Sequence, residues 1–121
     1  MNQEVKEVNP SVAYEKIQNG AILMDIREGE EIEMLAFDVE GQILIPQSEF
    51  ANRFREIPTD KEIIVGCNSG SRSLNISRFL MEQEFDTIYN LKGGITDWLE
   101  RGFPVKWDTY KTEKAVQANE F

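Results

Sequence analysis

Four short apolar segments, separated by stretches with helical spacing, constrain the fold of this 121-residue chain more than any other feature. The segments cover residues 21–26, 42–46, 62–66 and 87–91, and each has the length of a buried strand. Their apolar residues do not alternate strictly with polar ones, which is typical of strands covered on both faces. The pattern predicts an α/β fold with a central parallel sheet flanked by helices on both faces.

The segments between these strands carry helix signals. Asn9 and Pro10 are a typical N-cap and first helical residue, and Gly20 stands where a glycine ends a helix. Residues 71–84 place apolar side chains on one helical face. Helices are therefore expected to alternate with the strands along the chain.

One domain is expected, because the length is typical of a single domain and no internal repeat or linker is present. We predict that the domain covers residues 1–105 and that a polar C-terminal tail covers residues 106–121. Trp107 and Tyr110 are the candidates for anchoring this tail. The acidic segment 28–40 is expected to form a solvated face rather than a docking site for a partner.

The charge and the residue content exclude several classes of function. The net charge of −9 makes nucleic acid and anionic membranes poor partners. The chain has one cysteine and no histidine, so an internal disulfide, a zinc site of several ligands and a Cys–His catalytic pair are not expected. We expect no metal and no cofactor. No apolar run approaches a membrane span and no signal-like start is present, so a cytoplasmic location is expected.

Cys67 lies where the chemistry of this chain is expected to be concentrated. It directly follows the predicted strand 62–66 and precedes the predicted helix from Ser71. A loop at this place presents backbone N–H groups and the positive end of the helix dipole, and Gly70 permits the unusual backbone angles that such a loop requires. These groups stabilise a thiolate, so the expected activation of Cys67 requires no histidine.

Arg72 is expected to support the same thiolate and to face an anion. A cation in the first turn of a helix is mildly unfavourable, and a nearby anion would explain its place. The serine hydroxyls of the loop add further hydrogen-bond donors. The predicted catalytic residue is Cys67, and the predicted substrate-binding residues of the loop are Asn68, Ser69, Gly70, Ser71, Arg72 and Ser73.

Four segments resemble the signatures of the rhodanese, or sulfurtransferase, family in order and spacing. MDIRE at 24–28 resembles the Asp-x-Arg-Glu segment of the family, and GQILIP at 41–46 resembles its Gly-Ala-x-x-Ile-Pro. VGCNSGSRS at 65–73 resembles the active-site loop, and YNLKGGITDWLERGFPV at 89–105 resembles the C-terminal signature. The resemblance covers roughly residues 9–105 and implies a single rhodanese-like domain.

The resemblance also implies a reaction. Cys67 would take a sulfane sulfur from a small-molecule or protein donor, hold it as a persulfide and pass it to a thiol or to cyanide. Arg27 would either contact substrate or be structural, and we include it among the predicted substrate-binding residues. Asp25 is predicted to be structural and close to the site. Gly93, Gly94 and Trp98 are expected to be packing residues.

Two departures from the family pattern bear on the substrate. The segment after Asp-x-Arg-Glu is about two residues longer than usual, by comparison with the family, and lacks its histidine and first proline. The loop carries Asn68 and Ser71 where the family often has basic residues, so Arg72 is its only cation. A doubly charged donor such as thiosulfate is therefore expected to be attracted weakly.

Two other functions remain as alternatives. A phosphatase or arsenate reductase of the same fold would need a Cys-x5-Arg loop, whereas Cys67 and Arg72 form the shorter Cys-x4-Arg. An active-site loop with one residue fewer is expected to enclose too little space for a phosphate group. A non-catalytic binding or regulatory module is the second alternative, although such modules of this family often lack the cysteine that is present here.

Overall fold

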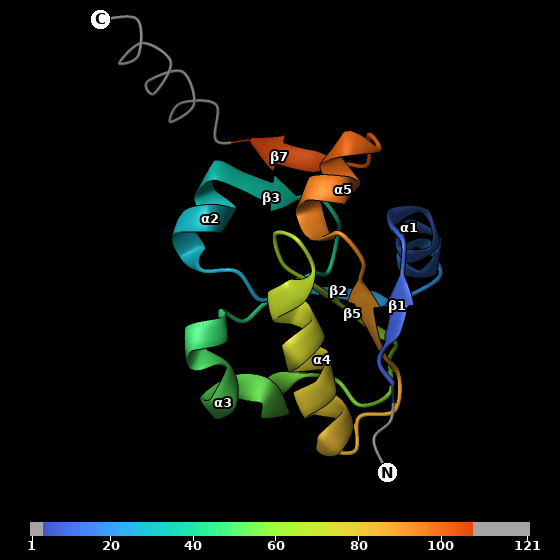
Figure 1. The fold of residues 1–121 in the computed structure, drawn as a ribbon, viewed down its shortest axis with the longest axis vertical. Coiled ribbons are helices and arrows are strands. Elements are labelled where there is room, and N and C mark those ends of the chain that lie inside the picture. Colours follow the sequence, from blue (N-terminus) through green and yellow to red (C-terminus); the bar gives the residue numbers. More distant parts are fainter. Residues whose placement is uncertain (1–3, 108–121) are drawn as a thin grey trace, which may run out of the picture.

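A five-stranded parallel sheet forms the centre of the computed structural model, which describes residues 4–107 (Figure 1). The strand order is β1-β6-β5-β2-β4, with every neighbouring pair parallel. The strands cover Lys6–Val8 (β1), Ile22–Asp25 (β2), Ile43–Leu44 (β4), Ile63–Gly66 (β5) and Ile88–Leu91 (β6). The parallel sheet and its four predicted strands are confirmed, and β1 is an additional edge strand.

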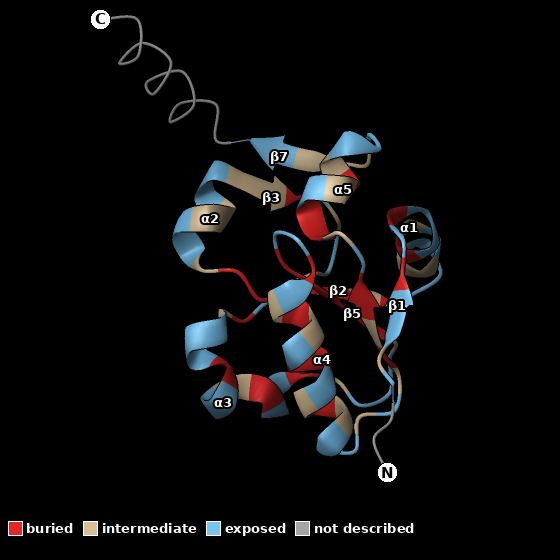
Figure 2. Ribbon diagram, in the orientation of Figure 1, coloured by how far each residue is buried: buried red, intermediate tan, exposed pale blue. Residues whose placement is uncertain are grey.

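Helices cover both faces of this sheet, as predicted. On one face lie α1 (Pro10–Gln18) and α5 (Gly94–Glu100), whose buried residues pack in one core around Trp98. On the other face lie α4 (Ser71–Glu82) and α3 (Phe50–Arg53), the latter between the short 3-10 helices at Gln47–Glu49 and Phe54–Glu56. Figure 2 shows the buried residues concentrated on the strands and on the inner sides of the helices.

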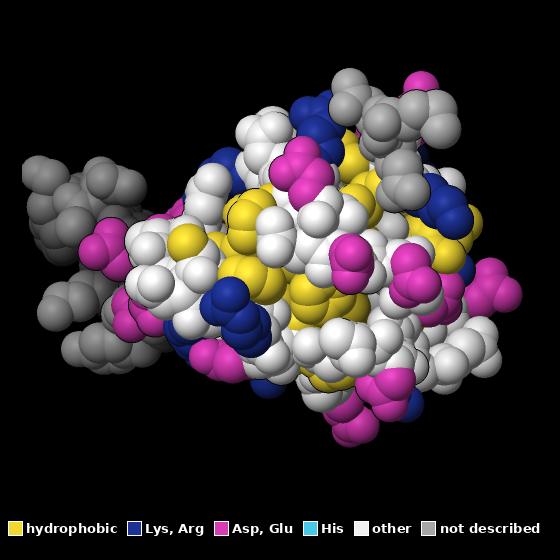
Figure 3. All heavy atoms as spheres, turned by 90° about the horizontal axis from the view of Figure 1, so that it is seen from below, with side chains coloured by type: hydrophobic (Ala, Val, Ile, Leu, Met, Phe, Trp, Pro, Cys, Tyr) yellow, Lys and Arg dark blue, Asp and Glu magenta, His cyan; other side chains and the backbone are white. Residues whose placement is uncertain are grey.

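The core beneath α3 and α4 extends to the molecular surface. Phe79, Met81 and Phe85 are partly buried and pack against it. Seen from below, this face of the molecule shows apolar side chains with acidic and basic side chains scattered among them, and the charged side chains do not form one continuous area (Figure 3). Within residues 4–107, no helix is long and apolar enough to cross a membrane.

The acidic segment 28–40 does not form a simple solvated face, so that expectation is wrong in part. Its residues form α2 (Gly29–Met34) and β3 (Leu35–Phe37), and β3 pairs antiparallel with β7 (Val105–Trp107). Phe37 has 0% exposure and its ring meets that of Trp98 edge-on, with 5.3 Å between centroids. The apolar residues of the segment therefore join the core, while several of its carboxylates remain exposed.

The C-terminal boundary predicted at residue 105 falls inside β7. Lys106 and Trp107 pair with β3 in the small sheet, and Trp107 is 54% exposed. Tyr110, the other predicted anchor, lies outside the described residues. The division into a domain at 1–105 and a tail at 106–121 stays a prediction.

The central position of β5 determines where the functional loop lies. Its last residue, Gly66, is paired in register with Asp25 at the end of β2. Because the strands are parallel, their carboxyl ends meet at one edge of the sheet, where ligands bind in folds of this class. Cys67, Asp25 and Arg27 are therefore brought to the same edge.

Candidate active site

Cys67 is the first residue after β5, and α4 begins four residues later at Ser71. Its Sγ accepts hydrogen bonds from the backbone N–H of Gly70 at 3.1 Å and from that of Ser73 at 3.4 Å. The thiol donates to Ser73 Oγ at 3.3 Å. The loop thus surrounds the sulfur with hydrogen-bonding groups at the N-terminal end of a three-turn helix, as predicted from the sequence.

Glycines give this loop its shape. Gly70 has φ of +97°, and a Cβ there would lie 3.1 Å from the backbone nitrogen of Gly93. Gly94, with φ of +59°, packs against the carbonyl oxygens of Cys67 and Asn68 so closely that a Cβ would overlap them. The backbone at the N-terminus of α5 can therefore pack directly against the loop. There the N–H of Ile95 donates to the carbonyl of Cys67 at 2.8 Å.

Cys67 is buried as well as surrounded, with 0% exposure for the whole residue. A donor can reach Sγ only if atoms of the loop or its neighbours move aside. The residue is the only cysteine of the chain, and it is a free thiol.

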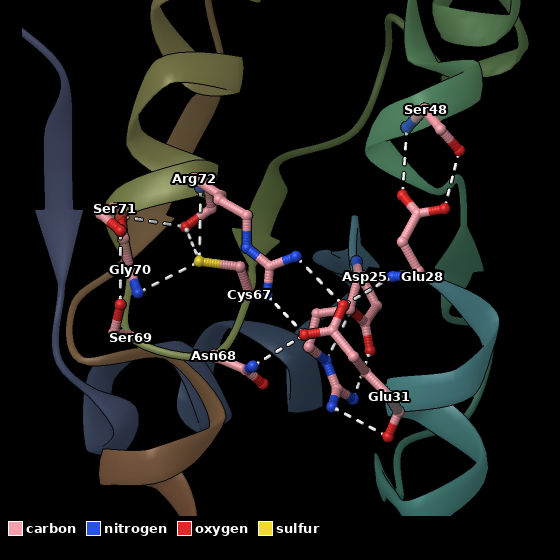
Figure 4. A network of polar contacts seen from close by, with 12 residues as sticks. Asp25, Glu28, Glu31, Ser48, Cys67, Asn68, Ser69, Gly70, Ser71 and Arg72 are labelled. Carbon is pink, nitrogen blue, oxygen red and sulfur yellow. Dashed lines mark hydrogen bonds and ion pairs between the residues drawn. The ribbon is translucent and has the colours of Figure 1, made fainter.

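Arg72 faces an anion, as predicted, but that anion is a carboxylate of the same chain. Its guanidinium donates to both oxygens of Glu31, at 2.7 Å from Nη2 to Oε1 and 3.0 Å from Nη1 to Oε2 (Figure 4). Asn68 Nδ2 donates to Glu31 Oε1 at 2.8 Å. We call these three residues, Glu31, Asn68 and Arg72, the Glu31 clamp, because they join α2 to the loop.

The ion pair changes the titration of both partners. The pKa of Glu31 is lowered to about 2, first by the hydrogen bonds from Arg72, then by the Glu28 N–H and by the positive charges of Arg72 and Arg27, with burial opposing them. The pKa of Arg72 is raised, mainly by the hydrogen bond to Glu31. Both groups are therefore charged throughout the neutral pH range.

We expect the stabilisation by Glu31 to be lost at acid pH. A carboxyl whose folded pKa is depressed contributes stability above its unfolded pKa, and the contribution disappears as pH falls from 4.5 to about 2. Glu31→Gln should therefore be less stable than the wild type at pH 7, and the difference should shrink towards pH 2. Urea unfolding of both proteins at pH 7, 4 and about 2.5 measures it; a difference that does not change with pH would contradict the ion pair.

The remaining loop residues differ in what they touch. Gly70 and Ser73 contact the sulfur directly, whereas Asn68 and Arg72 contact Glu31. The hydroxyls of Ser69 and Ser71 lie 3.3 Å from each other on the exposed side of the loop. Substrate binding by these residues stays a prediction, and the geometry supports it most for the N–H groups of Gly70 and Ser73.

Arg27 forms a buried ion pair with Asp25. Its Nη2 donates to Oδ2 at 2.8 Å and its Nε to Oδ1 at 3.1 Å, and the Arg27 N–H also donates to Oδ1 at 3.0 Å. Arg27 is 1% exposed and Asp25 0%. Of the two roles left open for Arg27, this geometry favours the structural one, because its guanidinium is directed to Asp25 rather than to solvent.

Two residues near the loop were not predicted from the sequence. Glu31 belongs to the acidic segment of the sequence, where it lies three residues after Glu28. This spacing is the one local signal for it, because it allows the Glu28 N–H to donate to the Glu31 side chain at 2.9 Å. Asn90, a residue of β6 with 0% exposure, donates from Nδ2 to the Gly70 carbonyl at 3.1 Å. No local pattern marked Asn90. Among residues 4–107, no group of three or more candidate ligands could hold a metal ion.

A family model for the rhodanese-like domain matches residues 9–101. The chain belongs to the rhodanese-like domain family. This confirms the resemblance seen in its four motifs and the predicted fold class. Two relatives are thiosulfate sulfurtransferase GlpE of Actinobacillus pleuropneumoniae serotype 5b, 35% identical over 88% of this chain and 97% of the relative, and that of Haemophilus influenzae PittEE, 33% identical over 83% and 93%.

Solved structures of rhodanese-like proteins share the fold. A rhodanese-related protein from Thermoplasma volcanium is 32% identical, with a TM-score of 0.74 and coverage of 84% of this chain and 97% of that one. The polysulfide-sulfur transferase homodimer from Wolinella succinogenes is 26% identical, with a TM-score of 0.75 and coverage of 84% and 78%. These comparisons support a sulfurtransferase of the rhodanese-like family.

Proposed function

We propose that this rhodanese-like protein is a sulfurtransferase in which Cys67 accepts a sulfane sulfur and carries it as a persulfide. The observation that carries the proposal is the place of Sγ, which lies within 3.1 Å and 3.4 Å of two loop amide nitrogens at the start of α4. Two relatives named thiosulfate sulfurtransferase and a structural neighbour named polysulfide-sulfur transferase support it. Arg27 is retained as a predicted substrate-binding residue, although its ion pair with Asp25 favours a supporting role.

The proposed reaction has two displacement steps. The Cys67 thiolate attacks the sulfane sulfur of the donor, the donor bond to that sulfur breaks, and the leaving group departs with the electron pair. A thiolate or cyanide then attacks the outer sulfur of the persulfide, and Cys67 leaves as a thiolate. Thiosulfate would release sulfite and cyanide would become thiocyanate, so the steps balance without an oxidant or cofactor.

The loop supplies the electrostatics of these steps. Negative charge lies on Sγ before the first step and after the second, and on the outer sulfur between them. Backbone N–H groups and the N-terminus of α4 stabilise negative charge at both places without moving a proton. The proposal places the reaction in the cytoplasm, where reducing conditions keep a lone cysteine available as a thiol.

A non-catalytic binding module is the second candidate, and the absence of exposed surface at Cys67 favours it. Phosphatase activity is less compatible with the site, because the Arg72 guanidinium is bound to both oxygens of Glu31. A phosphate would have to displace a carboxylate from the same donors.

A panel of reactions on the wild-type protein tests the proposal. Thiosulfate and glutathione persulfide serve as donors, cyanide and a small thiol as acceptors, and an aryl phosphate as the competing substrate. We expect thiocyanate or a new persulfide from at least one donor and no phosphate release. Phosphate release without sulfur transfer would favour the phosphatase, and inactivity with every donor would favour the binding module.

A further inference from the structure

Glu31 holds the active-site loop from outside the sheet. Its carboxylate accepts from Asn68, from both terminal nitrogens of Arg72 and from the Glu28 N–H, at 2.7–3.0 Å. Two of these partners, Asn68 and Arg72, belong to the loop, which lies 37 and 41 residues further along the chain. The carboxylate thus occupies the side-chain N–H donors of Asn68 and Arg72, which the loop would otherwise offer to an anion.

The clamp removes the positive charge from the loop. Arg72 is the only cation between Cys67 and Ser73, and Glu31 neutralises it. The next cation of the site, Arg27, is neutralised by Asp25. Each of these two ion pairs has a net charge of zero, in a chain of net charge −9.

The place of Arg72 makes this cancellation relevant to the sulfur. In Figure 4 its guanidinium lies between the Cys67 sulfur and the Glu31 carboxylate. The charge of Cys67 is among the causes that raise the pKa of Arg72, so the two groups interact electrostatically. A donor that approaches Sγ meets a neutral ion pair in place of a free guanidinium.

We propose that Glu31 is a specificity-determining residue. It selects against doubly negative sulfane donors and favours persulfides whose carrier is either uncharged or positively charged. The inference rests on the proposed sulfur transfer. Glu31 offsets most of the attraction that a free Arg72 guanidinium would exert on a dianion such as thiosulfate. A persulfide R–S–SH on a protein or on an amine-bearing thiol brings less negative charge to the site. In the transfer step the Cys67 thiolate attacks the outer sulfur of the persulfide, the S–S bond breaks and R–S⁻ leaves.

Glu31→Gln tests the charge with little change in shape. Glutamine has the same size and keeps an oxygen that can accept from Asn68 or Arg72, but it carries no charge. Glu30→Gln is the matched control, because it removes the same charge from the neighbouring, exposed residue of α2. Donors of decreasing negative charge complete the design: thiosulfate, methanethiosulfonate and cysteamine persulfide. The first two break the same kind of sulfur–sulfur bond and differ by one charge.

We expect Glu31→Gln to raise kcat/KM roughly tenfold for thiosulfate and roughly threefold for methanethiosulfonate, with no rise for cysteamine persulfide. The gain for thiosulfate should shrink at high ionic strength. Glu30→Gln should leave the ratios of kcat/KM between the three donors close to those of the wild type. The values of kcat/KM are compared between donors within one variant. A smaller folded fraction of that variant lowers all of them equally and does not change their ratio.

Three results would overturn the inference. Equal changes for all donors would show that Glu31 acts through the structure of the loop alone. The same selective gain in Glu30→Gln would assign the effect to net charge rather than to the clamp. Inactivity of the wild type and the variant with all three donors would refute sulfur transfer itself, and is distinguishable from the other two because no ratio could then be formed.

Discussion

Cys67→Ser should abolish sulfur transfer, reducing it by ~10³-fold or more, to the rate without protein. A serine hydroxyl is not ionised at neutral pH and is a far weaker acceptor of sulfane sulfur than a thiolate. The hydroxyl would still be within reach of the Gly70 and Ser73 amides, which now lie 3.1 Å and 3.4 Å from Sγ. Thiocyanate formation from each donor with cyanide as acceptor measures the loss.

The control for this variant is its fold. Because serine differs from cysteine in one atom, the circular-dichroism spectrum and the thermal midpoint should stay close to those of the wild type. A folded Cys67→Ser protein that still transfers sulfur would remove Cys67 from the mechanism.

Asp25→Asn should cause the largest loss of stability, about 3–5 kcal/mol in the free energy of unfolding. The substitution keeps the shape of the side chain and an acceptor for the Arg27 N–H. It leaves the Arg27 guanidinium, which is 1% exposed, without its counter-charge. Urea unfolding with a common m-value measures the change.

A double variant separates the buried charge from the packing. Arg27→Met removes the cation and keeps an unbranched apolar side chain over Phe37, whose ring lies 5.7 Å from the guanidinium carbon. Asp25→Asn combined with Arg27→Met should recover at least about half of the loss caused by Asp25→Asn alone, because no uncompensated charge remains. If the stability loss of the double variant equals the sum of the losses of the two single variants, the coupling between these residues is contradicted.

Three of the four strands found from the sequence have apolar runs that are buried on both faces, and the fourth, β4, is an edge strand marked by its apolar run before Pro46. β2, β5 and β6 lie inside the sheet, and their burial is encoded locally in their composition. β1 was missed because Lys6 and Glu7 make an edge strand look like polar chain. β3 and β7 were missed because each has three residues and pairs with a partner about 70 residues away, which no local pattern reveals.

The same distinction holds in the site. Cys67, Gly70 and Ser73 lie within seven consecutive residues, so the strand–loop–helix pattern was enough to predict their approach. Glu31 reaches Arg72 from 41 residues earlier in the chain, and an exposed acidic helix gives no sign of its partner. The motif therefore predicted the chemistry of the loop, whereas the charge that surrounds it depends on tertiary contacts.

The proposed persulfide is tested most directly by the mass of the intact protein. The wild type is reduced, incubated with thiosulfate or glutathione persulfide, freed of donor and analysed by mass spectrometry, with Cys67→Ser treated in parallel. The account predicts one added sulfur atom on the wild type, located at Cys67 by peptide analysis and removed by cyanide, and none on the variant. An unchanged mass with every donor, or an added sulfur that persists in Cys67→Ser, would contradict it.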